Sequence, residues 1–232
     1  MITKFIKRRL INFVEWHILQ RAEALANEQI FQQIFVQQCL NRGVRNDFYP
    51  VGGAAGYTLM YLLFRLLTEN RIESIVEFGS GQSTILIDRL HSATASHVCY
   101  EDDPYWHATI SAKVGRCDYR LCPLEQREID GVTCRTYSRM SDVEFDLMLV
   151  DGPRGVEEFS RFGCVETIRS NAAKEFIIVF DDCDRPGEIQ TIGFVERLLV
   201  SKGVVFRKRE FRGRTSHAIL ATAGFDSALD YW

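Results

Sequence analysis

The chain has 232 residues, of which 46% are hydrophobic and 25% charged, and its formal net charge is −3. This composition is that of an ordinary folded domain and excludes a disordered chain or a multi-span membrane protein. A chain of this length usually forms one domain with at most a short appendage. The small negative charge offers no overall positive field to hold a polyphosphate backbone, so we expect no nucleic-acid ligand.

Seven cysteines are present, an odd number, and no two of them form a Cys-x-x-Cys pair. This pattern argues against a disulfide framework and against a zinc knuckle, and it suits a reducing compartment. The first ten residues lack the apolar core and cleavage site of a secretory signal, and nowhere do 18 apolar residues follow one another. We therefore expect a cytoplasmic protein without a membrane span.

The N-terminal part differs from the rest in charge and in pattern. Residues 1–46 carry a net charge of +4, which leaves −7 for the remainder. Apolar residues recur at helical spacing over residues 1–18, where four basic residues precede the first acidic one. The pattern predicts a helix that packs on its own domain or on a second subunit, as in a homo-oligomer. Contact with an anionic membrane surface is the alternative.

A second helical stretch covers roughly residues 23–40, and turn residues follow it up to Pro50. A domain boundary is expected near there. We assign residues 1–53 to an N-terminal helical extension that serves as a lid, an oligomer contact or a membrane-surface contact. Residues 54–232 form the main domain.

The main domain opens with an apolar helical run from Tyr57 to Leu67, and strands and helices then alternate. Strands are expected at Ser74–Phe78, His97–Tyr100, Tyr119–Cys122, Phe145–Val150, Phe176–Phe180, Val204–Phe211 and Ala218–Ala221. Alternation of this kind indicates βαβ units around a buried, mostly parallel sheet of about five parallel strands. The last two runs are separated by too few residues for a crossover helix, so they predict an antiparallel hairpin.

The strongest local signal is an apolar strand that opens through two glycines into a helix, Ile75-Val-Glu77-Phe-Gly79-Ser-Gly81-Gln-Ser83-Thr84. Glycines let a ligand approach the backbone, and the helix N-terminus presents unpaired N–H groups to it. Dinucleotide-binding folds have a third glycine at the position of Thr84, which weakens an assignment to NAD binding. Twenty residues beyond Gly81, the acid Glu101 ends the second strand, where it can accept hydrogen bonds from ribose hydroxyls.

These features together resemble the class I S-adenosylmethionine-dependent methyltransferases over about residues 54–222. The resemblance implies an α/β, Rossmann-like sheet of seven strands, mostly parallel with an antiparallel C-terminal hairpin, and helices on both faces. It also implies S-adenosylmethionine as cofactor. The residues that it implies for cofactor binding are Glu77, Gly79, Gly81, Ser83, Thr84 and Glu101, the last as the ribose ligand. The adenine contact stays open.

Two further strands end in carboxylates. Asp151 follows Phe145–Val150, and the pair Asp181-Asp182 follows Phe176–Phe180. Because adjacent parallel strands end at the same edge of a sheet, we expect these three acids to converge. Like charges so close need protonation, hydrogen bonds or a cation, and hard oxygen ligands suit Mg²⁺ or another divalent ion. The alternative is that the acids cap loops or pair with Arg185.

The arrangement is similar to the cation-dependent O-methyltransferases of the catechol, macrocin-type sugar and cephalosporin-related kinds. That similarity implies metal ligands at Asp151, Asp181 and Asp182, and catalysis at Asp151. The implied reaction is methyl transfer to a hydroxyl group of a sugar or another small molecule. Two alternatives remain: an NAD- or nucleotide-sugar-linked oxidoreductase, and a catalytically silent scaffold that binds partners through its basic N-terminus.

Overall fold

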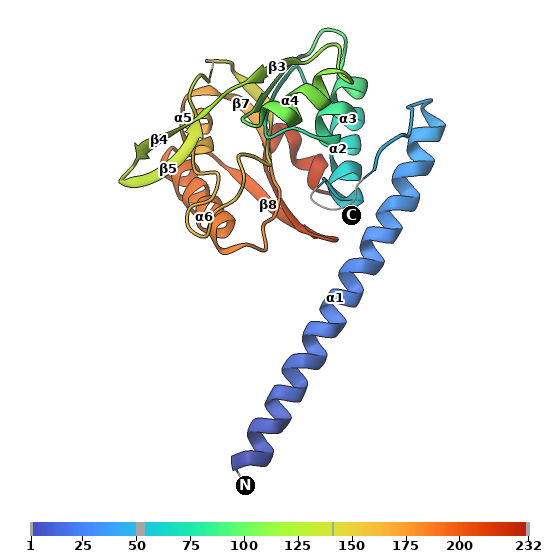
Figure 1. Ribbon diagram of the computed structural model, residues 1–232, viewed down its shortest axis with the longest axis vertical. Coiled ribbons are helices and arrows are strands. Elements are labelled where there is room, and N and C mark those ends of the chain that lie inside the picture. The colour runs from blue at the N-terminus through green and yellow to red at the C-terminus, as the bar shows by residue number, and fades with distance from the viewer. Residues whose placement is uncertain (1, 50–53, 141, 231–232) are drawn as a thin grey trace.

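The computed structural model describes residues 2–49, 54–140 and 142–230. Its centre is a seven-stranded sheet in the order β3-β2-β1-β6-β7-β9-β8 (Figure 1). The strands of this sheet are β1 (Ser74–Phe78), β2 (Ser96–Glu101), β3 (Asp118–Leu121), β6 (Phe145–Val150), β7 (Ala172–Phe180), β8 (Phe206–Arg212) and β9 (Ser216–Thr222). The helices are α1 (Ile2–Asn41), α2 (Tyr57–Glu69), α3 (Gln82–Leu90), α4 (Pro104–Ser111), α5 (Cys164–Asn171), α6 (Pro186–Ser201) and the 3-10 helix η1 (Ala223–Leu229).

The sheet confirms the predicted topology. Strands β3, β2, β1, β6 and β7 are parallel, and β9 lies antiparallel between β7 and β8. All seven predicted strands are present. The strand order reverses at β1, which pairs with both β2 and β6. A crevice is therefore expected beyond the carboxyl ends of β1 and β6, where parallel sheets of this kind bind their ligands.

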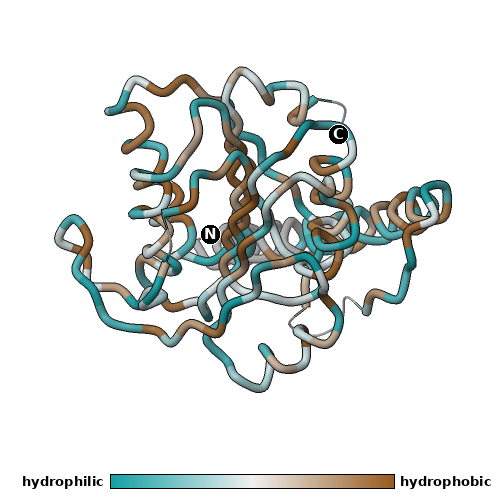
Figure 2. Tube along the Cα trace, turned by 90° about the horizontal axis from the view of Figure 1, so that it is seen from above, coloured by the Kyte–Doolittle hydropathy of each residue, from teal (hydrophilic) through white to brown (hydrophobic). Residues whose placement is uncertain are grey.

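The sheet separates two apolar layers. One face packs against α2, α3, η1 and the C-terminal part of α1, and the other packs against α5, α6 and a small hairpin. The residues of β6 and β7 that lie between these layers are almost all apolar, because a strand covered on both faces has no solvent side. Figure 2 shows hydrophobic residues concentrated along these central strands.

The small hairpin is a departure from the predicted pattern of strands and helices. Strands β4 (Leu124–Ile129) and β5 (Val132–Tyr137) pair with each other in a separate two-stranded sheet. In the chain they come after β3 and before β6. The turn residues of the hairpin, Asp130 and Gly131, have φ angles of 50° and 77°. Two residues with positive φ make the tight turn for which Asp-Gly is favoured. The Asp130-Gly131 dipeptide indicates this hairpin in the sequence, but the predicted strands did not include it.

Helix α1 is continuous from Ile2 to Asn41, whereas the sequence pattern predicted two helical stretches. No glycine or proline occurs before Gly43, so nothing in the local sequence ends the helix earlier. Phe35 and Cys39 near its C-terminal end are buried in the same core as α2, while the N-terminal half extends away from the body (Figure 1).

Several predictions for the N-terminal part fall outside what the structure describes. Most apolar side chains of the predicted stripe over residues 1–18 lie outside the described side chains, and the boundary at residue 53 lies in the undescribed segment 50–53. Among the described residues, no helix combines the length and the apolar character needed to cross a bilayer.

Candidate functional site

A cavity of 480 Å³ lies at the carboxyl ends of β1 and β6, where the strand order reverses. Its lining brings together the predicted glycine turn, the first turn of α3, and Asp151 from the end of β6. It also includes residues near the end of α1 and the start of α2. The lining residues are Tyr49, Ala54, Ala55, Ser80, Gly81, Gln82, Ser83, Trp106 and Asp151.

The glycine turn shapes the floor of this cavity. Gly79 has a φ of +82°, and a Cβ atom added there would lie 2.7 Å from the backbone nitrogen of Gly152. A Cβ atom on Gly152 would in turn lie 2.5 Å from Gly79. The loops after β1 and β6 therefore touch backbone to backbone, which brings Asp151 beside the turn. At Gly81 an added Cβ would meet only Trp106, at 4.0 Å, so the backbone there is open to a ligand.

Glu77 and Thr84 lie beneath the turn and support it. The fully buried carboxylate of Glu77 accepts a hydrogen bond from Ser83 Oγ at 2.6 Å and lies 3.0 Å from Nε2 of His97. Thr84 Oγ1 accepts a hydrogen bond from the backbone N–H of Gly81 at 2.9 Å. Ser83 lines the cavity. Contacts of Glu77, Ser83 and Thr84 with a cofactor stay predictions.

His97 links Glu77 to a pair of cysteines. Burial works to lower the pKa of His97, but hydrogen bonds to Cys117 and Glu77 outweigh it and raise that pKa to about 9. A hydrogen bond from Cys99 and the nearby His97 lower the pKa of the Cys117 thiol to about 7, against the effect of burial. His97 and Cys117 thus shift each other's pKa beneath the glycine turn. The odd number of cysteines gave no indication of this pairing in the sequence.

Glu101 is the buried last residue of β2; it contacts Ser80 of the cavity lining without lining the cavity itself, and its role as ribose ligand stays a prediction. One of its oxygens accepts hydrogen bonds from Ser80 N–H at 3.1 Å and Ser80 Oγ at 2.6 Å. The other accepts from the backbone N–H groups of Asp102 and Asp103, both at 2.9 Å. These four donors hold the carboxylate in one orientation before any ligand binds. Asp103 caps helix α4 by accepting from Tyr105 and Trp106, as its position before Pro104 predicts.

Trp106 is a cavity residue that the sequence analysis did not select. It lies in the first turn of α4, and its indole N–H donates to the carbonyl oxygen of Ser80 at 2.6 Å. This hydrogen bond fixes the ring beside the glycine turn. The signal available in the sequence was an aromatic residue one helical turn beyond the acid of the second strand.

The three predicted carboxylates meet. Ligand oxygens of Asp151, Asp181 and Asp182 all lie within 4.8 Å of one another. Asp181 accepts a hydrogen bond from the backbone N–H of Asp182 at 2.7 Å and lies 2.7 Å from Nδ1 of the fully buried His217. Asp182 pairs with Arg185 at 2.8 Å, which was the alternative role foreseen for these acids. The convergence predicted from strand order is therefore present, and the ligand role of the three acids stays a prediction.

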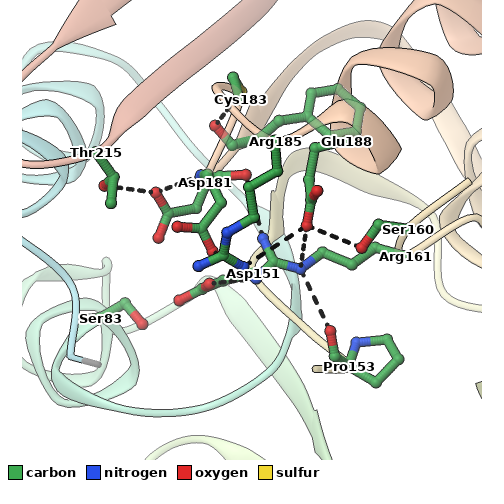
Figure 3. Close-up of polar contacts among 12 residues, drawn as sticks. Ser83, Asp151, Pro153, Ser160, Arg161, Asp181, Cys183, Arg185, Glu188 and Thr215 are labelled. Carbon is green, nitrogen blue, oxygen red and sulfur yellow. Dashed lines mark hydrogen bonds and ion pairs between the residues drawn. The ribbon is translucent and has the colours of Figure 1, made fainter. Parts of the chain in front are cut away.

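A buried arginine that the sequence analysis did not identify enters this cluster. Nη2 of Arg161 lies 2.9 Å from Asp182 Oδ2 and 3.3 Å from Asp151 Oδ1 (Figure 3). Its Nη1 donates to the carbonyl oxygen of Asp181 at 3.1 Å. Arg161 comes from the loop between β6 and α5, ten residues after Asp151. Loop arginines are usually solvated, so spacing alone gave no reason to select it.

The acids of the cluster respond differently to this environment. Burial and the nearby Asp181 raise the pKa of Asp151, and Arg161 counteracts them. Burial also works to raise the pKa of Asp181, but His217 and Arg161 prevail and hold it well below its ordinary value. Burial and Asp181 raise the pKa of Asp182. The cluster therefore holds one firmly ionised carboxylate beside two that take up protons more readily.

A second cavity, of 270 Å³, is lined in part by the segment that follows Asp151. The hairpin of β4 and β5 forms one wall, and the loop from Pro153 to Arg161 forms the other. Its lining includes the exposed side chains of Arg135, Arg154 and Glu158. The loop after β6 thus contributes Asp151 to the first cavity and Pro153 and Arg154 to the second.

No family model matches the sequence, and no curated protein matches it. The structure is similar to an O-methyltransferase from Bacillus cereus in complex with SAH, at 15% identity and a TM-score of 0.54, over 87% of this chain and 99% of that one. It is also similar to the O-methyltransferase TomG from Streptomyces achromogenes in complex with SAM, at 10% identity and a TM-score of 0.55, over 88% of this chain and 98% of that one.

The likeness extends over nearly the full length of both solved structures, and it agrees with the strand order and the antiparallel β9 described above. At identities this low, structural similarity establishes the fold and leaves the activity to be argued from the site. The chain has the fold of the class I S-adenosylmethionine-dependent methyltransferases.

Proposed function

We propose that this protein transfers the methyl group of S-adenosylmethionine to a hydroxyl group of a small molecule, such as a sugar. The observation that carries the proposal is the 480 Å³ cavity, which has a glycine turn, a helix N-terminus and a carboxylate in its lining. Such a cavity at the reversal of strand order suits a nucleoside cofactor. The solved structures with the same fold that bind SAH or SAM support the choice of cofactor.

The residues of the chain suggest how the cofactor is held. The N-terminal turn of α3 offers unpaired N–H groups to the carboxylate of the methionine part. Glu101, oriented by Ser80, would accept hydrogen bonds from the ribose hydroxyls. Asp151, the cavity residue at the end of β6, would lie on the side of the methyl group that is transferred.

Methyl transfer requires an acceptor oxygen in line with the S–CH₃ bond. In the proposed step Asp151 takes the hydroxyl proton as the oxygen attacks the methyl carbon. The O–CH₃ bond forms, the S–CH₃ bond breaks, and the electron pair stays on sulfur, which leaves neutral S-adenosylhomocysteine. Asp151 is the candidate general base because it is the carboxylate of the cluster that lines the 480 Å³ cavity. The acceptor would lie toward the 270 Å³ cavity, whose lining includes the exposed side chains of Arg135, Arg154 and Glu158.

The predicted Mg²⁺ or other divalent cation is a separate question. The oxygens of Asp151, Asp181 and Asp182 are the hard donors that such an ion prefers. The same cluster, however, already contains the guanidinium of Arg161. The proposed reaction therefore contains no step that depends on a metal. Location in the cytoplasm is part of the proposal, because all seven cysteines are free thiols.

Isothermal titration calorimetry tests the cofactor assignment. We expect S-adenosylmethionine and S-adenosylhomocysteine to bind with one site per chain, and NAD not to bind. Glu101→Gln should weaken the binding of both S-adenosylmethionine and S-adenosylhomocysteine by roughly tenfold or more, because the ribose loses a charged hydrogen-bond acceptor. Glu128→Gln, at an exposed position of β4, is the matched control and should leave the affinity unchanged.

Binding of NAD alone would replace the proposal with an oxidoreductase, and binding of neither nucleotide would favour a catalytically silent scaffold. If cofactor binding is found, incubation with S-[methyl-³H]-adenosylmethionine and a panel of hydroxylated sugars and phenols measures transfer. Transfer only to amines or thiols would contradict the choice of a hydroxyl acceptor.

A further inference from the structure

Arg161 is the most completely engaged side chain of the carboxylate cluster. Its side chain is only 5% exposed. Besides Asp151 and Asp182, its donors reach two backbone carbonyl groups, Asp181 through Nη1 at 3.1 Å and Pro153 through Nε at 3.3 Å. Every predicted metal-binding residue is thus in contact with this one guanidinium.

The position of Arg161 is fixed from behind by the loop and by α6. Glu188, at 3% side-chain exposure, lies 3.8 Å from Nε of Arg161 and accepts a hydrogen bond from Ser160 Oγ at 2.8 Å. Figure 3 shows Arg161 extending between Glu188 on one side and Asp151 on the other. To leave the cluster, Arg161 would have to give up its contacts with the aspartates and with Glu188 while buried. This is costly for a charged side chain.

Two cations of the chain already offset part of the negative charge of the cluster. The carboxylates of Asp151, Asp182 and Glu188 lie within 3.8 Å of the guanidinium of Arg161, and those of Asp182 and Glu188 also lie within 3.8 Å of Arg185. A divalent ion at the three aspartates would lie within a few ångströms of the guanidinium of Arg161, and the repulsion between two buried cations would oppose its binding.

We propose that the guanidinium of Arg161 takes the place of a divalent cation in this cluster, so that Asp151 acts without a metal. Arg161 is then a positioning residue. It neutralises the cluster and orients one oxygen of Asp151, while the other oxygen is left for the acceptor proton. The consequence for catalysis rests on the proposed function, but the exclusion of the metal does not.

Titration with Mn²⁺, followed by electron paramagnetic resonance of the free ion, tests the exclusion directly. The wild-type chain should leave the free Mn²⁺ signal unchanged. Arg161→Gln removes the charge and should bind one Mn²⁺ per chain, which lowers the free-ion signal in proportion to the protein added. Arg161→Lys keeps a cation and should exclude Mn²⁺ as wild type does. Arg185→Gln is the matched control, because Arg185 is 49% exposed, contacts Asp182 alone among the three aspartates, and leaves Arg161 in place.

Stoichiometric binding of Mn²⁺ to the wild type that is lost in Asp151→Asn would overturn the proposal. So would a folded Arg161→Gln variant that binds no Mn²⁺. If Arg161→Gln does not fold, the wild-type titration decides alone: an unchanged signal supports the proposal, and binding that depends on Asp151 refutes it. The experiment uses neither cofactor nor acceptor, so a failure of the proposed methyl transfer would not alter its result.

Discussion

Gly79 is the residue at which the glycine turn meets the loop after β6. Its positive φ and the 2.7 Å approach to Gly152 leave no room for a side chain. Gly79→Ala should therefore lower the free energy of unfolding by about 2–4 kcal/mol. Gly43→Ala is the control, because Gly43 has a φ of +65° with no atom near its would-be Cβ, and it should cost about 1 kcal/mol. Urea unfolding measures both, and equal losses would mean that the close approach is unimportant.

Cys117 is the thiol most perturbed toward ionisation among the described cysteines. With its pKa lowered to about 7, it should react with iodoacetamide before the buried cysteines, and the rate should rise between pH 6 and 8. The pKa values of Cys164 and Cys183 are raised by burial, so these thiols should stay unreactive in this range. Peptide mapping by mass spectrometry identifies the labelled residue. His97→Gln should move the profile to higher pH, and a profile unaffected by this variant would disprove the pairing.

Helix α1 is joined to the body through Glu28. Its carboxylate accepts from the backbone N–H of Tyr57, from Thr58 Oγ1 at 2.6 Å and from Arg214 N–H at 3.2 Å. Glu28 thus caps the N-terminus of α2, where Gly56 has no side chain to do so, and it also holds the turn between β8 and β9. A long helix that looks separable in the sequence is thus tied to the domain by Glu28, in addition to the buried Phe35 and Cys39.

Glu28→Gln should destabilise the protein by about 1–2 kcal/mol, because an amide cannot replace a charged acceptor at a helix N-terminus. Hydrogen exchange at residues 57–60 should accelerate, which mass spectrometry measures. Glu23→Gln, at an exposed position of the same helix, should change neither quantity. Unchanged exchange in Glu28→Gln would show that the N-terminus of α2 does not depend on the charge of Glu28.

The whole molecule consists of an α/β body and a helix that reaches beyond it (Figure 1). Val14, Ile18 and Leu25 are exposed on α1 at spacings of four and seven residues, which place them on one side of the helix. Exposed apolar residues with this spacing are typical of a helix that packs against another one. We therefore expect the protein to self-associate through α1, in agreement with the predicted packing of this helix on a second subunit.

Replacing Ile18 and Leu25 by lysine should shift the protein toward the monomer, which sedimentation velocity measures. Gln29→Lys adds a charge at an exposed polar position of α1 and serves as the control. A wild-type protein that sediments as a monomer at its highest soluble concentration would rule out this role for the helix.

The local sequence determined most of the sheet. Apolar runs bounded by turn residues located all seven strands, because a strand covered on both faces must be almost wholly apolar. The strand assignment also identified the glycines and acids that end β1, β2, β6 and β7. They were expected to lie together because the carboxyl ends of parallel strands meet at one edge of a sheet. What the local pattern missed was a tight Asp-Gly turn, which makes a hairpin where a crossover helix is usual.

Tertiary structure decided what the acids of the site contact. The sequence shows three carboxylates that converge, and it leaves open whether a metal, a proton or a cation of the chain balances them. The fold brings Arg161 from a loop to within 3.3 Å of Asp151 and 2.9 Å of Asp182, and it directs Glu77 toward His97 rather than toward the cavity. Contacts of this kind depend on loop paths and side-chain burial, which no spacing along the chain encodes.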